Sequence, residues 1–217
     1  RNLKMTMLIR HSVTVLWGGY IKPNVSLCDD YDKVYYNYPI WDANDKPFVD
    51  LDLPSGTLWA TMNVGASKAS DAGLYFQWGD TQGYTADQVG TENGKKEFAR
   101  DESDYKWGKN PNFTKYTTTG ATLDLEDDAA HVNMGGNWHM PTPDQIDELI
   151  HNTMNEWTTQ DGVNGILFTS KTNPSKSIFI PAAGGAWDGS VQDSGDNGNG
   201  WSSMLFTDDV DYGQYLY

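Results

Sequence analysis

The side chains that could carry out chemistry are few and widely spaced in this sequence. His131 and His139 are separated by eight positions across a Gly-Gly pair, which is not the spacing of one helix face. Cys28 is the single cysteine, so the chain can form neither an intrachain disulfide nor a thiolate pair that binds a metal. No Gly-x-Ser-x-Gly nucleophile motif is present. We therefore expect no enzyme activity, no catalytic residues and no transition metal held by His131 and His139.

Oxygen ligands are more abundant, above all near the C-terminus. Asp188, Asp193, Asp196 and Asn197 carry hard oxygen atoms of the kind that calcium binds, although their spacing is not that of an EF-hand. Turn-forming Asp and Asn residues explain the same positions without an ion. The sequence therefore leaves calcium open and predicts no other cofactor.

Composition narrows the class of protein. The 217 residues suffice for one domain with an extension, and nine Trp, twelve Tyr and seven Phe supply material for a core. A net charge of −15 disfavours nucleic acid, because phosphate binding requires clustered Lys and Arg. The chain contains no apolar run of about 18 residues, so membrane insertion is not expected.

Alternating apolar and polar residues predict short strands in the first half of the chain. Residues 48–54 and 58–64 alternate on either side of a Ser55-Gly56 turn. The 22 glycines and many Asn, Asp, Ser and Thr indicate frequent turns and argue against a helical bundle.

One helix is predicted by local chemistry, from Thr142 to about Thr153. Thr142 and Gln145 form a capping-box pattern, and Pro143 falls at the first helical position, where its missing N–H costs nothing. Ile146, Leu149 and Ile150 then form an apolar stripe. A second, shorter helix is expected near Ser67–Ala72.

Four segments are expected along the chain. Residues 1–47 form a strand-like, Tyr-rich N-terminal extension, and residues 48–217 form the main domain. Within that domain, residues 80–122 are predicted to be a polar surface insertion with an amphipathic piece near Phe98. Residues 185–215 show little periodicity and are expected to form binding loops, since recognition residues concentrate on loops held by a scaffold.

Several of these motifs together resemble a known family, the Fibrobacter succinogenes major paralogous domain family of gut Bacteroidales and their phages. The motifs are Pro54-Ser55-Gly56-Thr57-Leu58-Trp59-Ala60-Thr61-Met62-Asn63-Val64-Gly65-Ala66, Gly73-Leu74-Tyr75-Phe76-Gln77-Trp78-Gly79-Asp80, Gly135 to Gln145, and Ile180-Pro181-Ala182-Ala183-Gly184. That family is similar to the sulfatase-modifying, formylglycine-generating group. The resemblance implies an α+β, C-type lectin-like fold over residues 48–217, with short antiparallel strands and two main helices.

The same fold is used by the variable proteins of diversity-generating retroelements, whose C-terminal loops are randomised for ligand binding. Adenine mutagenesis of an Asn codon can produce Asp, Gly, Leu or Phe, but not Trp. By resemblance and composition, nine residues are candidates for one exposed binding surface: Trp187, Asp188, Asp193, Asn199, Gly200, Leu205, Phe206, Asp208 and Asp211. An ordinary Gly/Asn/Asp loop region in a relative that is not diversified is the alternative.

Two function classes follow from the sequence. The first is a ligand-binding module with a hypervariable C-terminal surface, which recognises a protein or glycan ligand outside the cell, on a bacterial cell surface or a phage virion. The second is a structural or accessory domain of an exported bacterial protein without a dedicated ligand site. For either class we expect Trp59, Trp78, Trp138 and Trp201 to be buried, with each indole N–H hydrogen-bonded.

Overall fold

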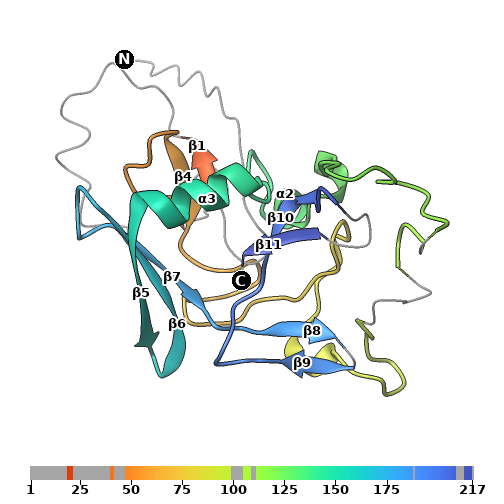
Figure 1. Ribbon diagram of the computed structural model, residues 1–217. Helices are drawn as coiled ribbons and strands as arrows, with labels where there is room; N and C mark the ends of the chain where they lie inside the picture. Colours follow the sequence, from red (N-terminus) through yellow and green to blue (C-terminus); the bar gives the residue numbers. More distant parts are fainter. Residues whose placement is uncertain are drawn as a thin grey trace, which may run out of the picture.

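The structure is a computed structural model that describes residues 19–21, 40–41, 47–98, 105–108, 111–187, 189–208 and 213–216. Within these residues two α-helices and several small antiparallel sheets form a mixed α+β architecture, which confirms the predicted class (Figure 1). None of the helices in these ranges combines the length and the apolar character needed to cross a membrane.

The two strands predicted from alternation are present but shorter than expected. β3 (Pro47–Asp50) and β4 (Thr57–Ala60) pair antiparallel, with Val49 opposite Trp59. Gly56, at φ +73°, closes the turn between them by donating its N–H to the carbonyl of Leu53 at 2.9 Å.

Two short strands from the N-terminal extension complete this first sheet. β1 (Gly19–Ile21) pairs with β4, and β2 (Ile40–Trp41) pairs with β3, which gives the order β1-β4-β3-β2. The predicted extension therefore contributes to the same sheet as the main domain.

Strand β4 is buried on both faces, so it separates two hydrophobic clusters. Leu58 and Ala60 belong to one cluster, together with Trp138 and Met140. Trp59 points into the other cluster. The alternation of side chains along a strand accounts for this division. The second cluster consists of Leu51, Leu53, Trp59, Ile146, Leu149, Phe168, Ile178 and Ile180.

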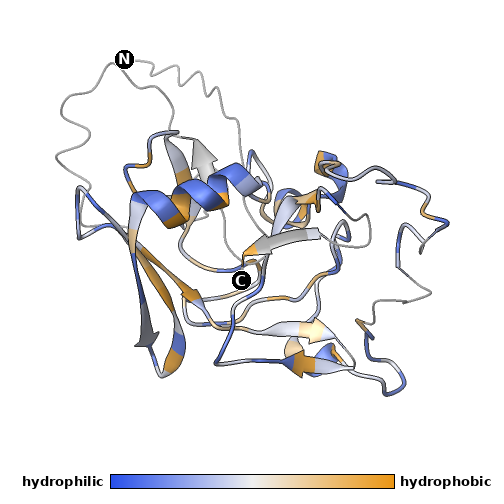
Figure 2. Cartoon of the chain, in the orientation of Figure 1, coloured by the Kyte–Doolittle hydropathy of each residue, from blue (hydrophilic) through white to orange (hydrophobic). Residues whose placement is uncertain are grey.

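Helix α3 (Pro143–Asn152) confirms the helix predicted from capping. The Thr142 side chain accepts from the N–H of Gln145, and the Gln145 side chain accepts from the N–H of Thr142 at 2.9 Å. Leu149 and Ile146 project into the cluster that lines the sheet of β5 (Thr153–Gln160), β6 (Val163–Ser170) and β7 (Ser177–Pro181). In Figure 2 the hydrophobic positions of α3 lie on its lower side, toward this sheet.

The prediction of a short helix near Ser67–Ala72 is wrong. Those residues form turns, and Asp71 Oδ2 accepts from the backbone N–H of Ser67 and of Lys68 at 3.1 and 3.2 Å. Such side-chain capture of the backbone competes with helix formation. The second helix is instead α2 (Ala129–Met134), which follows the 3-10 helix η2 (Leu125–Asp127).

Three of the four selected tryptophans are buried as predicted: Trp59, Trp78 and Trp138. Trp201 is only half-buried. The Trp78 indole N–H donates to the carbonyl of Ser202 at 3.0 Å, and that of Trp201 donates to the carbonyl of Phe76 at 2.9 Å. These two bonds tie the C-terminal strands to the segment 74–79.

The prediction that residues 185–215 are aperiodic loops is wrong in part. The segment contains β8 (Gly185–Trp187), β9 (Ser190–Gln192), β10 (Gly200–Leu205) and the start of β11 (Gly213–Leu216). β8 pairs with β9 and β10 pairs with β11, both antiparallel.

Strand β5 is the edge of its three-stranded sheet among the residues that the structure describes. It pairs with β6 without a register shift over eight residue pairs, from Thr153 to Gln160. Two large apolar side chains on it are exposed, Met154 at 49% and Trp157 at 53%.

Candidate recognition surface

The β8–β9 hairpin divides its side chains between the core and the solvent. Ala186 and Val191, which are paired, pack against a cluster formed by Tyr75, Val89 and Phe98. Because side chains alternate along a strand, the other two pairs of the hairpin lie on its outer face. Those pairs are Gly185 with Gln192 and Trp187 with Ser190.

Trp187 lies against Gly185 on that outer face. A β-carbon at Gly185 would overlap Cζ3 of the Trp187 ring and would lie 2.8 Å from Nδ2 of Asn199. Glycine at position 185 therefore leaves space over the strand that both the indole and the Asn199 amide approach. Trp187 remains 36% exposed, and Asn199 is half-buried. We name Gly185, Trp187, Ser190, Gln192 and Asn199 the hairpin face.

Hydrogen bonds to backbone carbonyls hold the hairpin to the rest of the molecule. Tyr75 donates its hydroxyl to the carbonyl of Ala183 at 2.8 Å, and burial raises the pKa of this hydroxyl. Gly184 donates its N–H to the carbonyl of Asn197 at 2.7 Å, and Gly195 donates to Ala182 at 2.8 Å. Gly184 has φ +70°, and a β-carbon there would overlap the carbonyl oxygen of Gln192. The support of the hairpin face is therefore ordered, and position 184 leaves no room for a residue larger than glycine.

Three of the nine candidate residues lie at or beside this hairpin. Trp187 and Asn199 both lie next to Gly185. Asp193 is exposed, follows β9 and has its backbone against Gly184. Asp193 adopts φ +55°, and its carbonyl accepts from the N–H groups of Asp196 and Asn197 at 3.1 and 3.0 Å. These bonds define a turn, which is the role that Asx residues commonly take.

The prediction that Gly200 and Leu205 belong to an exposed surface is wrong. Leu205 is 3% exposed and packs in the cluster that contains Trp138. Its N–H donates to the carbonyl of Ala121 at 2.9 Å, so β10 is covered by a segment distant in sequence. Gly200 is also buried, at the start of β10 opposite Leu216.

Phe206 and Asp208 are exposed, but they follow the far end of β10. Phe206 is 42% exposed, and its carbonyl accepts from Gly120 at 3.0 Å. In Figure 1 this end of β10 lies beside α2, whereas β8 and β9 lie at the opposite, lower edge of the molecule. The exposed candidates therefore lie in two separate places. Asp188 and Asp211 lie outside the described residues.

Gly185, Ser190 and Gln192 are residues of this face that were not predicted from the sequence. Their signal is the eight-residue run Gly185-Ala-Trp-Asp-Gly-Ser-Val-Gln192, in which an Asp-Gly pair stands between two short alternating segments. That pattern is typical of a β-hairpin, and its period of two places Gly185 and Trp187 on one face.

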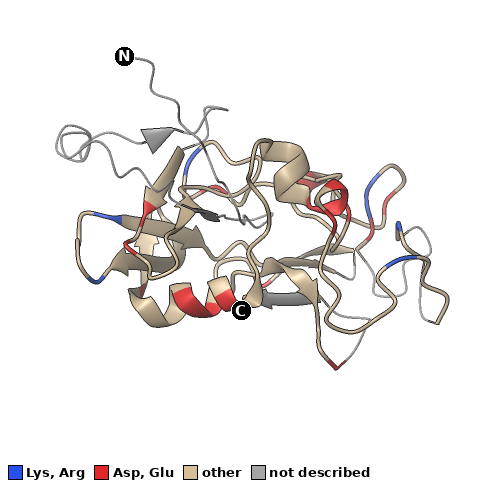
Figure 3. Cartoon of the chain, turned by 90° about the horizontal axis from the view of Figure 1, so that it is seen from above, with Lys and Arg blue, Asp and Glu red and all other residues tan. Residues whose placement is uncertain are grey.

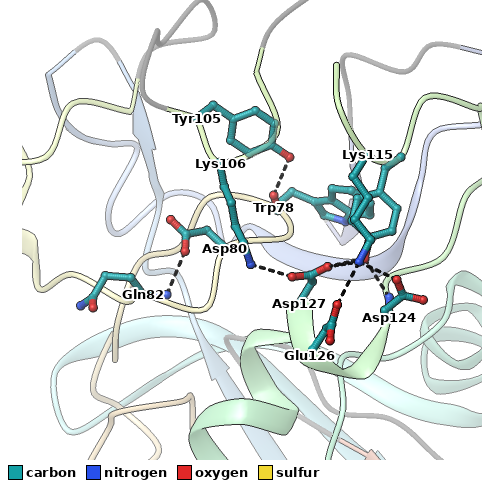
Figure 4. A network of polar contacts seen from close by, with 10 residues as sticks. Trp78, Asp80, Gln82, Tyr105, Lys106, Lys115, Asp124, Glu126 and Asp127 are labelled. Atoms are coloured by element: carbon teal, nitrogen blue, oxygen red, sulfur yellow. Dashed lines mark hydrogen bonds and ion pairs between the residues drawn. The ribbon is translucent and has the colours of Figure 1, made fainter. Parts of the chain in front are cut away.

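A polar cluster around Asp127 joins residues of the predicted insertion to η2 (Figure 4). Asp127 is 2% exposed and accepts from Lys106 Nζ and Lys115 Nζ, both at 2.6 Å, and from the Tyr116 hydroxyl at 2.7 Å. Burial opposes ionisation, but these donors together hold the pKa of Asp127 below its ordinary value. The ring of Trp107 lies beneath both ammonium groups, with its centroid 4.6 Å from Lys106 Nζ and 5.1 Å from Lys115 Nζ.

Within the described ranges, one group of three acidic side chains brings its oxygens close enough for a shared metal ion: Asp124, Glu126 and Asp127. Lys115 already lies among them, with its Nζ 2.6 Å from both aspartates and 3.4 Å from Glu126. The carboxylates of Asp124 and Asp127 raise the pKa of Lys115. The cluster therefore carries its own cation and fastens the insertion to η2. Figure 3 shows how acidic residues gather here and on α3.

Asp128 is buried and caps α2. Its carboxyl oxygens accept from the N–H of His131 at 2.9 Å and from the N–H of Met140 at 2.8 Å. Burial raises the pKa of Asp128 to about 8, although backbone donors at His131 and Ala130 oppose the rise. The carboxyl thus joins α2 to the segment that precedes α3.

Both histidines considered for metal binding contact backbone carbonyls. Nδ1 of His131 lies 3.0 Å from the carbonyl oxygen of Trp138, and Nδ1 of His139 lies 3.1 Å from that of Met140. These contacts orient the rings along the Gly135–Met140 segment.

Comparison of the chain with protein-family models, with curated proteins and with solved structures finds no match.

Proposed function

We propose that this protein is a ligand-recognition module and that the hairpin face is its contact surface. One observation carries the proposal: Trp187 is an exposed aromatic side chain backed by Gly185, with the Asn199 amide beside it, on a hairpin whose inner face is fixed in the core. A few residues commonly account for most of the binding energy at recognition surfaces, and tryptophan is enriched among them.

The rigidity of the support favours recognition over a passive loop. Binding residues that are already ordered lose less conformational entropy when the ligand binds. The bonds from Tyr75 to Ala183 and from Gly184 to Asn197 provide such order directly beneath the hairpin. We propose binding rather than catalysis, because the hairpin face presents an aromatic ring and amide groups.

The resemblance to the Fibrobacter succinogenes major paralogous domain family extends the proposal. By that resemblance the fold is C-type lectin-like, the protein acts outside the cell on a bacterial surface or a phage virion, and a diversity-generating retroelement varies its C-terminal segment. The coding DNA tests this last part. A reverse-transcriptase gene nearby, with a near-copy of the 3′ segment that differs at adenines, is the expected finding. A locus without a template copy contradicts it.

A binding experiment tests the hairpin face directly. Fluorescently labelled protein is titrated onto a panel of intact gut Bacteroidales cells, and saturable binding to at least one strain is expected. Trp187→Ala should weaken that binding at least about tenfold, in line with loss of an aromatic hot spot. Trp157→Ala is the matched control, because it removes an exposed tryptophan from a different hairpin.

A structural or accessory domain is the second candidate function. The burial of Leu205 and Gly200, two of the nine candidates, favours it, because those positions serve the core. Under this alternative no strain binds saturably, or Trp187→Ala and the native protein bind equally. Either result overturns the recognition proposal.

A further inference from the structure

Building on the proposed recognition function, we infer that the hairpin face binds a neutral saccharide. One sugar ring would stack on the indole of Trp187, while its hydroxyl groups would hydrogen-bond to the Asn199 amide and to Gln192. The inference rests on three features of the hairpin face: the position of its aromatic ring, the polar groups around that ring, and the charge of the face.

The mounting of Trp187 suits a flat, C–H-rich ligand. Its six-membered ring lies against the bare α-carbon of Gly185, which supports the indole along the strand. The face of an aromatic ring carries partial negative charge, and it attracts the partially positive hydrogens of a neighbouring group. The axial C–H groups of a pyranose provide such hydrogens on one side of the ring.

The polar groups around Trp187 are of the kind that hydroxyls require. A side-chain amide has both donors and an acceptor, which matches the dual character of a sugar hydroxyl. Gln192 donates to the Ser190 hydroxyl at 2.6 Å, which leaves its amide oxygen as an acceptor beside the hairpin. No residue that the structure describes forms a hydrogen bond with the Asn199 side chain, although Nδ2 lies next to the indole.

Charge favours a neutral ligand over an anionic one. The five residues of the hairpin face are uncharged, and the exposed carboxylate of Asp193 lies just beyond β9. The Lys95 side chain packs beside Gly90, which lies close to Gly189 in the turn of the hairpin. Its ammonium group is paired with Glu92 at 3.3 Å. In a chain of net charge −15, such a surface repels acidic groups.

The face is also too narrow for an apolar peptide. Trp187 is the one large apolar residue on the described part of the hairpin that is exposed, while Ala186 and Val191 face inward. Protein interfaces generally surround their anchors with a wider apolar core. A single aromatic ring flanked by two amides matches the width of one sugar residue.

Glycan arrays with neutral and acidic oligosaccharides, followed by calorimetry on the best ligand, test the inference. Neutral glycans should bind, and Trp187→Ala should lower their affinity about tenfold or more. Trp187→Tyr should retain most of the binding, because it keeps an aromatic face, and Trp157→Ala should bind like the native protein. Preference for acidic glycans over neutral ones would contradict the inference.

Gly185→Ala provides a sharper variant, since it changes no group that contacts the ligand. Gly185 has an ordinary φ, and its new methyl would meet the ends of two side chains, so the fold should tolerate it. The methyl must displace the Trp187 ring, and glycan affinity should fall about as much as in Trp187→Ala. Unchanged affinity in Gly185→Ala would overturn the stacking geometry.

Treatment of the bacterial cells separates this inference from the proposed function. Periodate, which cleaves vicinal diols of sugars, should abolish the binding that depends on Trp187, whereas proteinase treatment should spare it. The reverse pattern would overturn the saccharide inference and leave recognition through the hairpin face intact. Equal binding by native protein and Trp187→Ala before any treatment would overturn both.

Discussion

At the scale of single residues, Asp128 is the clearest case of a buried acid with a structural task. Its carboxyl oxygens accept backbone N–H groups from α2 and from Met140, which precedes α3. Burial raises its pKa to about 8, whereas an aspartate in an unfolded chain titrates near pH ~4. Between these values the folded state holds a proton that the unfolded state releases.

The free energy of unfolding should therefore decrease as pH rises from about 5 to 9, and level off above the folded pKa. The contribution of Asp128 is at most roughly 1.4 kcal/mol per pH unit. Urea denaturation of the native protein and of Asp128→Asn at pH 5 and at pH 9 isolates the contribution of Asp128, because the variant has no carboxyl group to titrate at this position. The stability difference between the two proteins should be smaller at pH 9. A difference that stays constant from pH 5 to pH 9 would refute the raised pKa.

Burial acts to raise the pKa of Asp127, one residue earlier, but this pKa is lowered and not raised, because two ammonium groups form hydrogen bonds with its carboxylate. Asp127→Asn keeps the shape but removes the charge that Lys106 and Lys115 bind. We expect it to cost about 2–4 kcal/mol, as for hydrogen bonds to a buried charge. Urea denaturation measures the loss, and limited proteolysis should cut faster within residues 80–122. Lys95→Ala, which breaks an exposed pair, is the control and should change stability by about 0–1 kcal/mol.

At the scale of elements, α3 is a brace between the two larger sheets. Its capping box and Pro143 start it, and Leu149 and Ile146 bury its apolar stripe against β6 and β7. Such a helix gains most of its stability from packing, because ten residues are too few for an isolated helix to persist in water.

Leu149→Ala should accordingly destabilise the protein by about 2–5 kcal/mol, since a fully buried side chain leaves a cavity. Asp147→Ala on the exposed side of the same helix should change stability by about 0.5 kcal/mol or less. Chemical denaturation of both variants provides the comparison. A loss below about 1 kcal/mol for Leu149→Ala would show that α3 is not part of the cooperative core.

At the scale of the whole molecule, β4 joins two hydrophobic clusters that would otherwise be independent. Leu58 and Ala60 face one of them, and Trp59 faces the other. Because the four residues of β4 pack against both clusters, loss of order in one cluster removes part of the packing surface of the other.

We therefore expect one cooperative unfolding transition. Far-UV circular dichroism and tryptophan fluorescence should report the same midpoint, which is the usual test of two-state unfolding. Leu58→Ala, although it touches one cluster, should lower both midpoints equally. Two separate transitions, with only one moved by the substitution, would show that the clusters fold independently.

The elements that could be predicted from the sequence are those with local signals. α3 follows from Thr142, Pro143 and Gln145, which act within one turn of helix. Leu205 could not be placed, because its burial depends on the segment around Ala121, more than eighty positions away. The segment that begins at Ser67 forms a turn instead of the predicted helix for another reason: the Asp71 side chain accepts from backbone N–H groups of Ser67 and Lys68.

The candidate site, too, could be predicted from the sequence only in part. The contrast of Trp187 with its neighbours predicts an exposed aromatic residue, but the approach of Asn199 to Gly185 depends on three-dimensional placement. The contact of Asn199 with β8 depends on the bridge between Gly184 and Gly198, which no local pattern indicates.

The long, regular edge of β5 has a consequence for handling the purified protein. The strand contains neither Lys nor Pro, residues that natural edges use against unwanted pairing, and it exposes Met154 and Trp157. In dilute buffer, the net charge of −15 keeps copies apart. Screening shortens the reach of that repulsion from about 10 Å in 0.1 M salt to about 3 Å in 1 M. Light scattering should therefore record self-association that grows with salt and that Trp157→Lys suppresses, so storage in low salt is the better condition.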